Sequence, residues 1–250
     1  MSIKASILIA AYEKEEELAN VFTSISKQKT NFDFEVCFVD DCSYINTQPI
    51  YNSYLNIPNK KGIRLKQHIG NRMADTSSIS GFKNSYHLAY DLAAPESEIF
   101  IVQSADVIWG QDNLLQELVD GSKNMEIPTC RVMNMRIEPD LHLHWEEGIK
   151  RWTDFANGEG KNLEYQGRSR EVVAWLVPFT RECMNKMNYK INCGEYHITN
   201  SPIHFGYKHV YRDDLLAFHQ FHRSIPSASV NNIENLVNWT IGIHPERVIF

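Results

Sequence analysis

Short continuous apolar runs, each followed by a stretch with helical spacing, constrain the fold of this chain more than any other feature. Residues 6–12 read SILIAAY, and residues 13–28 then place apolar side chains along one helix face. A strand without alternating polar residues is covered on both faces, as in a parallel sheet flanked by helices. Further buried strands are predicted over residues 34–43, 62–67 and 98–106, and helices over residues 80–93 and 113–122. This alternation predicts an α/β fold with a mostly parallel central sheet.

Polar side chains follow three of these predicted strands. Tyr12 ends the first strand, Asp40 and Asp41 end the second, and Asp106 ends the strand over residues 98–106. The carboxyl ends of parallel strands meet at one edge of a sheet, and ligands of open α/β sheets bind there. The pattern therefore predicts a binding site at this edge.

The second half of the chain is less regular. Residues 139–170 are rich in charges, glycine and tryptophan, and they predict loops with a short helix. Residues 171–187 predict a strand followed by a helix, and residues 232–241 a closing helix. Asp112 precedes the helix over 113–122 as a candidate N-cap. No repeat or linker interrupts the sequence, so a single domain over residues 1–250 is predicted.

Composition excludes several classes of protein. The net charge of −6 argues against a nucleic-acid binder held by bulk electrostatics. No stretch reaches the roughly 20 apolar residues that span a bilayer. The five cysteines are scattered and form no CxxC pair, which is typical of free thiols in a reducing compartment. A cytoplasmic protein is predicted.

The ordered motifs resemble those of family 2 glycosyltransferases. SILIAAYEKEEEL, EVCFVDDCS and IFIVQSADVIWGQDNLLQELV are followed by WLVPFTRECMNKM, CGEYHI and LAFHQFHRS, in the order of that family's landmarks. The resemblance implies the GT-A fold, in which a Rossmann-like, mostly parallel central sheet is flanked by helices beside a less regular acceptor-side half. Residues 1–125 would form the donor half, which binds a nucleotide-sugar, and residues 126–250 the acceptor half.

The resemblance assigns binding of the donor's nucleotide base to two motifs. Ala10 and Tyr12 fall where the family has Pro–x–Tyr–Asn, so Tyr12 would stack on the base. Asp41 would accept a hydrogen bond from N3–H of uracil, which favours uridine over cytidine, while Asp40 would order the turn. Lys83 matches a family arginine near the phosphates or base, and Arg72 is the alternative. A lysine supplies a point charge there but not a bidentate fork.

Ser104, Ala105 and Asp106 occupy the family's Asp–x–Asp position, with serine in place of the first acid. The resemblance implies Mn²⁺ or Mg²⁺ at this position, bridging the donor phosphates and held largely by oxygen ligands. Asp106 and His219 are the expected metal ligands. His222 is the expected contact to the phosphate or the acceptor.

Glu195, in CGEYHI, matches the carboxylate that acts in the family as general base on the acceptor hydroxyl. Tyr196 replaces the aspartate that usually follows it. Elsewhere, His142 and His144 in DLHLHWEE are interpreted as one face of a strand. Trp145, Trp152 and Trp175 are interpreted as core residues, with a platform for the acceptor sugar as the alternative.

The leading hypothesis is an inverting, metal-assisted glycosyltransferase that takes a UDP-sugar and builds surface polysaccharide. Its acceptor would be a saccharide or lipid-linked saccharide, which allows loose association with the inner face of the membrane. The first alternative is a catalytically degenerate GT-A-like scaffold, motivated by Ser104 and Tyr196. The second is a sugar nucleotidyltransferase, which AAYEKEEEL disfavours because such enzymes carry a glycine-rich, basic loop there.

Overall fold

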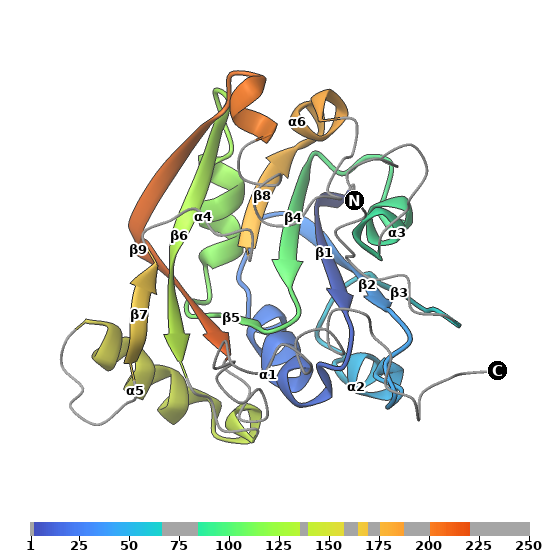
Figure 1. Ribbon diagram of the computed structural model, residues 1–250, viewed down its shortest axis with the longest axis vertical. Helices are drawn as coiled ribbons and strands as arrows, with labels where there is room; N and C mark the ends of the chain where they lie inside the picture. The colour runs from blue at the N-terminus through green and yellow to red at the C-terminus, as the bar shows by residue number, and fades with distance from the viewer. Residues whose placement is uncertain are drawn as a thin grey trace, which may run out of the picture.

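A five-stranded, mostly parallel sheet forms the centre of the molecule (Figure 1). The computed structural model describes residues 3–66, 85–135, 140–157, 165–169, 176–187 and 201–220. The strands of this sheet lie in the order β3-β2-β1-β4-β8, and only β8 runs antiparallel to its neighbour. They are β1 (Ile3–Ala11), β2 (Asp33–Asp40), β3 (Lys60–Arg64), β4 (Ile99–Ser104) and β8 (Leu176–Thr180). The predicted α/β fold with a mostly parallel central sheet is confirmed.

Helices cover both faces of this sheet, which is why its inner strands β1, β2 and β4 are predominantly apolar. Successive side chains of β1 point to opposite faces, so Ile7 and Ile9 pack in one core cluster and Leu8 in another. The helices of the first cluster are α1 (Glu15–Ser26), α2 (Gln48–Ser53) and α4 (Leu114–Gly121). The helices of the second are α3 (Ser85–Leu92) and α6 (Arg181–Lys186).

A second sheet, which the sequence pattern did not predict, lies beside the first (Figure 1). Its strands lie in the order β5-β9-β6-β7, with β6 and β9 parallel to each other. They are β5 (Val107–Trp109), β9 (Lys208–Gln220), β6 (Glu126–Met135) and β7 (Tyr165–Ser169). Because β5 starts three residues after β4 ends, the turn between them joins the two sheets. Asp106 lies in that turn.

The region predicted as loops with a short helix contains more regular structure. Leu141–Leu143 forms a 3₁₀ helix, η1, so the strand predicted around His142 and His144 is wrong. The helix α5 (Trp145–Ala156) follows it. Trp145 and Trp152 are buried in a third core cluster with Phe218 of β9, as expected for core tryptophans.

Three further predictions can be compared with the structure, concerning a helix cap, membrane spans and the cysteines. Helix α4 is preceded by Asn113 and has no side-chain cap, so the proposed Asp112 cap is wrong. The closing helix over 232–241 and Trp175 lie outside the described residues. Within the described part of the chain, no helix is long and apolar enough to cross a membrane. The four cysteines found in that part are buried and free.

Gly110 leaves room for the close approach of β5 and β9. A methyl group at this position would lie 2.8 Å from the carbonyl oxygen of Leu216 and 3.0 Å from the ring of Phe218. We expect Gly110→Ala to lower the free energy of unfolding by about 1–3 kcal/mol, the usual cost of overpacking. Chemical denaturation would measure this loss in the free energy of unfolding.

Asp112→Ala is the matched control, because that side chain is half exposed and forms a surface ion pair with the exposed Lys29. Its unfolding free energy should stay within about 0.5 kcal/mol of the wild-type value. Equal stability of the Gly110→Ala and wild-type proteins would contradict the packing described here.

Candidate functional site

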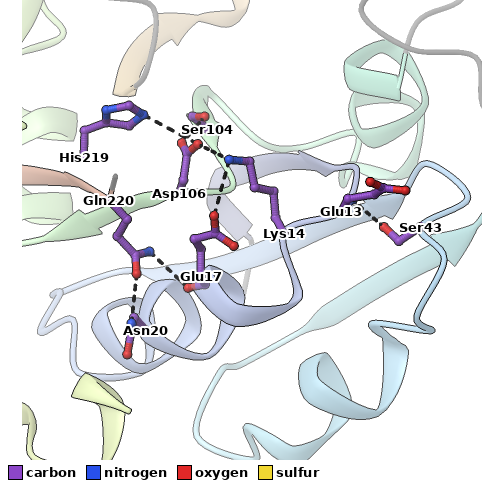
Figure 2. A network of polar contacts seen from close by, with 9 residues as sticks. All are labelled: Glu13, Lys14, Glu17, Asn20, Ser43, Ser104, Asp106, His219 and Gln220. Atoms are coloured by element: carbon purple, nitrogen blue, oxygen red, sulfur yellow. Dashed lines mark hydrogen bonds and ion pairs between the residues drawn. The ribbon is translucent and has the colours of Figure 1, made fainter. Parts of the chain in front are cut away.

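Asp106 is the centre of a group of polar side chains between the two sheets (Figure 2). Its side chain is only 9% exposed. The hydroxyl of Ser104 donates to its Oδ1 at 2.6 Å. Its Oδ2 lies 2.9 Å from Nζ of Lys14 and 3.5 Å from Nε2 of His219. Both carboxylate oxygens are therefore engaged, by residues from three separate parts of the chain.

Lys14 and Asp106 are both charged at neutral pH. Burial alone would raise the pKa of Asp106, but the hydrogen bond to His219 and the charge of Lys14 lower that pKa far below 3.8. Burial alone would lower the pKa of Lys14, but the charges of Asp106 and Glu17 outweigh it and raise that pKa. Nζ of Lys14 also lies 3.4 Å from Oε1 of Glu17. The site thus holds a partly buried ammonium between two carboxylates.

A pair of buried amides fixes the end of β9 against α1. Asn20 donates from Nδ2 to Oε1 of Gln220 at 2.8 Å, and Gln220 donates from Nε2 to the carbonyl of Glu17 at 3.1 Å. The backbone N–H of Gln220 donates to the carbonyl of Asp106 at 2.8 Å. His219 precedes Gln220, so these three bonds hold its imidazole beside Asp106 (Figure 2).

The carboxyl ends of three neighbouring strands form the rim of the site. The order β2-β1-β4 places Asp41, Tyr12 and Asp106 after adjacent strands. Asp41 is 2% exposed, donates its backbone N–H to Ala11 at 2.8 Å, and accepts at Oδ2 from the hydroxyl of Ser85 at 2.7 Å. Tyr12 is half-buried.

The side chain of Asp40 accepts hydrogen bonds within the turn after β2. It accepts from the backbone N–H of Ser43 at 2.8 Å and from the hydroxyl of Thr47 at 2.8 Å. Nε of Arg64 lies 3.3 Å from its Oδ2. Cys42 adopts a φ of +63°, a left-handed conformation that this network supports. Asp40 therefore holds the loop that presents Asp41.

The structure brings together some of the residues that the sequence singled out. Ser104, Asp106 and His219 converge in one group. Ala10 is paired with Ser104 across β1 and β4, and Ala105 is buried beneath the turn. Four candidates lie outside the described residues, namely Glu195, Lys83, its alternative Arg72, and His222.

Several residues of the site were not identified from the sequence. Lys14 is the N-cap residue of α1, and it stands in the acidic run after Tyr12. Its place between a strand end and a helix start was a signal, because such junctions lie at the ligand-binding edge of the sheet. Ser85, Glu17, Asn20 and Gln220 had no comparable signal, since their partners come from distant parts of the chain.

Asp106 and His219 fit a divalent cation that a ligand helps to hold. One carboxylate and one imidazole suit Mn²⁺, which accepts both oxygen and nitrogen donors. Among the described residues, no three histidine, cysteine or acidic side chains cluster closely enough to form a complete site. The remaining ligands of an octahedral ion would have to come from phosphate oxygens and water.

Two solved structures share this architecture. A mannosyltransferase from Pyrobaculum calidifontis, PcManGT, in complex with GDP-Man and Mn²⁺, matches with a TM-score of 0.58 and 13% identity, over 90% of this chain and 59% of its own. TarS residues 1–349 from S. aureus, in complex with UDP, matches with a TM-score of 0.54 and 16% identity, over 88% of this chain and 61% of its own. The chain thus spans about three fifths of each. At these identities the likeness establishes the fold.

Sequence comparison supplies the family. No curated protein matches the chain significantly in sequence. The model of the family described as glycosyl transferase family 2 matches residues 6–137, which is more than half of the chain and includes Tyr12, Asp41 and Asp106. With the GT-A fold of its structural neighbours, the chain belongs to glycosyl transferase family 2.

Proposed function

We propose that this protein transfers a sugar from a nucleoside diphosphate donor, with uridine as the base, to a saccharide or lipid-linked saccharide acceptor. The transfer would invert the anomeric centre and serve surface polysaccharide synthesis. The group formed by Asp106, His219 and Lys14 at the carboxyl edge of the sheet carries this proposal. One carboxylate, one imidazole and one ammonium at the ligand-binding edge suit a diphosphate with its counterions.

The nucleoside would lie over the ends of β1 and β2. Tyr12 would stack on the base, and Asp41 would accept from a ring N–H. Uracil has such a donor at N3, whereas N3 of cytosine is an acceptor. Guanine also has a ring N–H, and one structural neighbour was solved with GDP-Man and another with UDP. A direct comparison of nucleotides must therefore separate uridine from guanosine.

The diphosphate would lie beside Asp106 and His219. Asp106 is charged and largely shielded from water, so it can bind a cation strongly. A divalent cation held there would neutralise the charge that develops on the leaving diphosphate. Ser104 orients Asp106 by donating to Oδ1, and the amide pair of Asn20 and Gln220 orients His219.

Removal of a proton from the acceptor hydroxyl is assigned to Glu195. Inverting transfer needs a base on the side opposite the leaving group, because the hydroxyl loses its proton as it attacks. Glu195 lies outside the described residues, so this role rests on the resemblance of CGEYHI to the family segment.

A nucleotide panel tests the proposal directly. Calorimetry with UDP, GDP, CDP and dTDP, each with and without Mn²⁺, should show tightest binding of UDP. Mn²⁺ should strengthen it by about tenfold or more, which corresponds to roughly 1.4 kcal/mol. If the folded protein bound none of the four nucleotides, the proposed function would be wrong.

Two substitutions distinguish the contribution of the metal to nucleotide binding from that of base stacking. Asp106→Ala should abolish the strengthening by Mn²⁺, because it removes the principal metal ligand. Tyr12→Ala should weaken UDP binding by about tenfold or more with and without Mn²⁺, since base stacking contributes roughly 1–3 kcal/mol. Calorimetry of both variants measures these effects.

The controls are a carboxylate and a tyrosine away from the rim. Asp112→Ala removes a half-exposed carboxylate, and Tyr211→Ala a half-buried ring of β9 that is paired with Thr129. Neither should change nucleotide binding. Equal, metal-independent losses in Asp106→Ala and Tyr12→Ala would contradict the separate roles.

A further inference from the structure

Lys14 contacts the same oxygen that a metal ion would use. Its Nζ lies 2.9 Å from Oδ2 of Asp106, which is also the oxygen nearest to Nε2 of His219. Oδ1 faces the other way and accepts from Ser104. An ion that bound both Asp106 and His219 would have to approach Oδ2, and the ammonium of Lys14 is already there (Figure 2).

We propose that Lys14 is the resident cation of the donor site, that it competes with the divalent metal for Oδ2 of Asp106, and that it moves to the donor diphosphate when the metal binds. The competition follows from the geometry alone. The movement to the diphosphate rests on the proposed function.

Charge balance favours this exchange. Without a nucleotide, Asp106 has one negative charge and Lys14 neutralises it at contact distance. A metal ion that entered alone would displace the ammonium and place three positive charges beside only two carboxylates, those of Asp106 and Glu17. A diphosphate adds the negative charge that allows both cations to stay, so metal and nucleotide should bind cooperatively.

The structure also keeps Lys14 within reach of a ligand. Its backbone caps α1 at the rim, and its side chain is 26% exposed, against 9% for Asp106. Glu17, one turn later on α1, provides a second carboxylate at 3.4 Å. When Asp106 is taken by a metal, Lys14 thus retains an anionic partner on its own helix while its ammonium faces the rim.

Mn²⁺ binding to the nucleotide-free protein tests the competition. Titrations followed by electron paramagnetic resonance should show that Lys14→Met binds Mn²⁺ at least about tenfold more tightly than the wild-type protein, because a competing unit charge at this distance is removed. Lys14→Arg, which keeps the charge, should bind Mn²⁺ as weakly as the wild type. Equal Mn²⁺ affinity of Lys14→Met and wild type would overturn the proposal.

Lys27→Met is the matched control. It removes the same charge from the C-cap of the same helix, roughly 20 Å away. Its Mn²⁺ affinity should equal that of the wild type. A gain as large as that of Lys14→Met would show that net charge alone, and not competition for Oδ2, sets the affinity, and would also overturn the proposal.

A measurement on the wild-type protein covers the case in which Lys14→Met fails to fold. Amine acylation read by mass spectrometry reports how accessible each lysine is. Mg²⁺ should increase the labelling of Lys14, since the metal displaces its ammonium from Asp106, and leave Lys27 unchanged. Labelling of Lys14 that is indifferent to saturating Mg²⁺ would count against the exchange.

Nucleotide binding by the same proteins separates this proposal from the proposed function. With saturating Mn²⁺, Lys14→Met should bind UDP about tenfold more weakly than the wild type, because the ammonium that moves to the diphosphate is gone. Unchanged UDP affinity would rule out the movement of Lys14 to the diphosphate without contradicting the proposed function. The opposite outcome is that neither the wild type nor the variants bind any nucleotide, while Lys14→Met still binds Mn²⁺ more tightly. That result would contradict the proposed function and support the competition for Oδ2.

Discussion

The buried carboxylate of Asp106 is the interaction on which the rest of the site depends. It lies in the turn that joins the two sheets, and its backbone carbonyl accepts from Gln220 at the end of β9. Its side chain engages Ser104, Lys14 and His219. A charge so shielded from water is stable only with partners, so the ends of β4, α1 and β9 must converge on it.

The central sheet could be predicted because strands covered on both faces leave a plain pattern. β1, β2 and β4 are mostly buried and appear in the sequence as predominantly apolar runs. The second sheet leaves no such pattern. β9 is half-buried or exposed over its first residues, including Arg212 and Asp214, and only its last part is apolar. Its pairing with β6 is also long-range and shifts in register after Cys130.

The candidate site was partly predictable for a similar reason. Asp41 and Asp106 follow buried strands, so topology alone brings them to one edge. Lys14 stands among glutamates, and such a run favours a solvated helix start over a buried ion pair. Its contact with Asp106 depends on the direction in which the side chain leaves the start of α1, which the sequence pattern does not reveal. The division into donor and acceptor halves, and the roles of Glu195, Lys83 and His222, stay predictions.

The amide pair of Asn20 and Gln220 ties α1 to the end of β9. Lys14 belongs to the start of that helix and His219 to that strand end, so a displacement of α1 carries both groups in the same direction. Side chains that seat α1 on the sheet, such as Phe22 against Phe38 and Tyr51, thereby set how far both groups lie from the carboxylate of Asp106. A substitution in this aromatic cluster would therefore displace both partners of Asp106 together, although none of its rings touches the site.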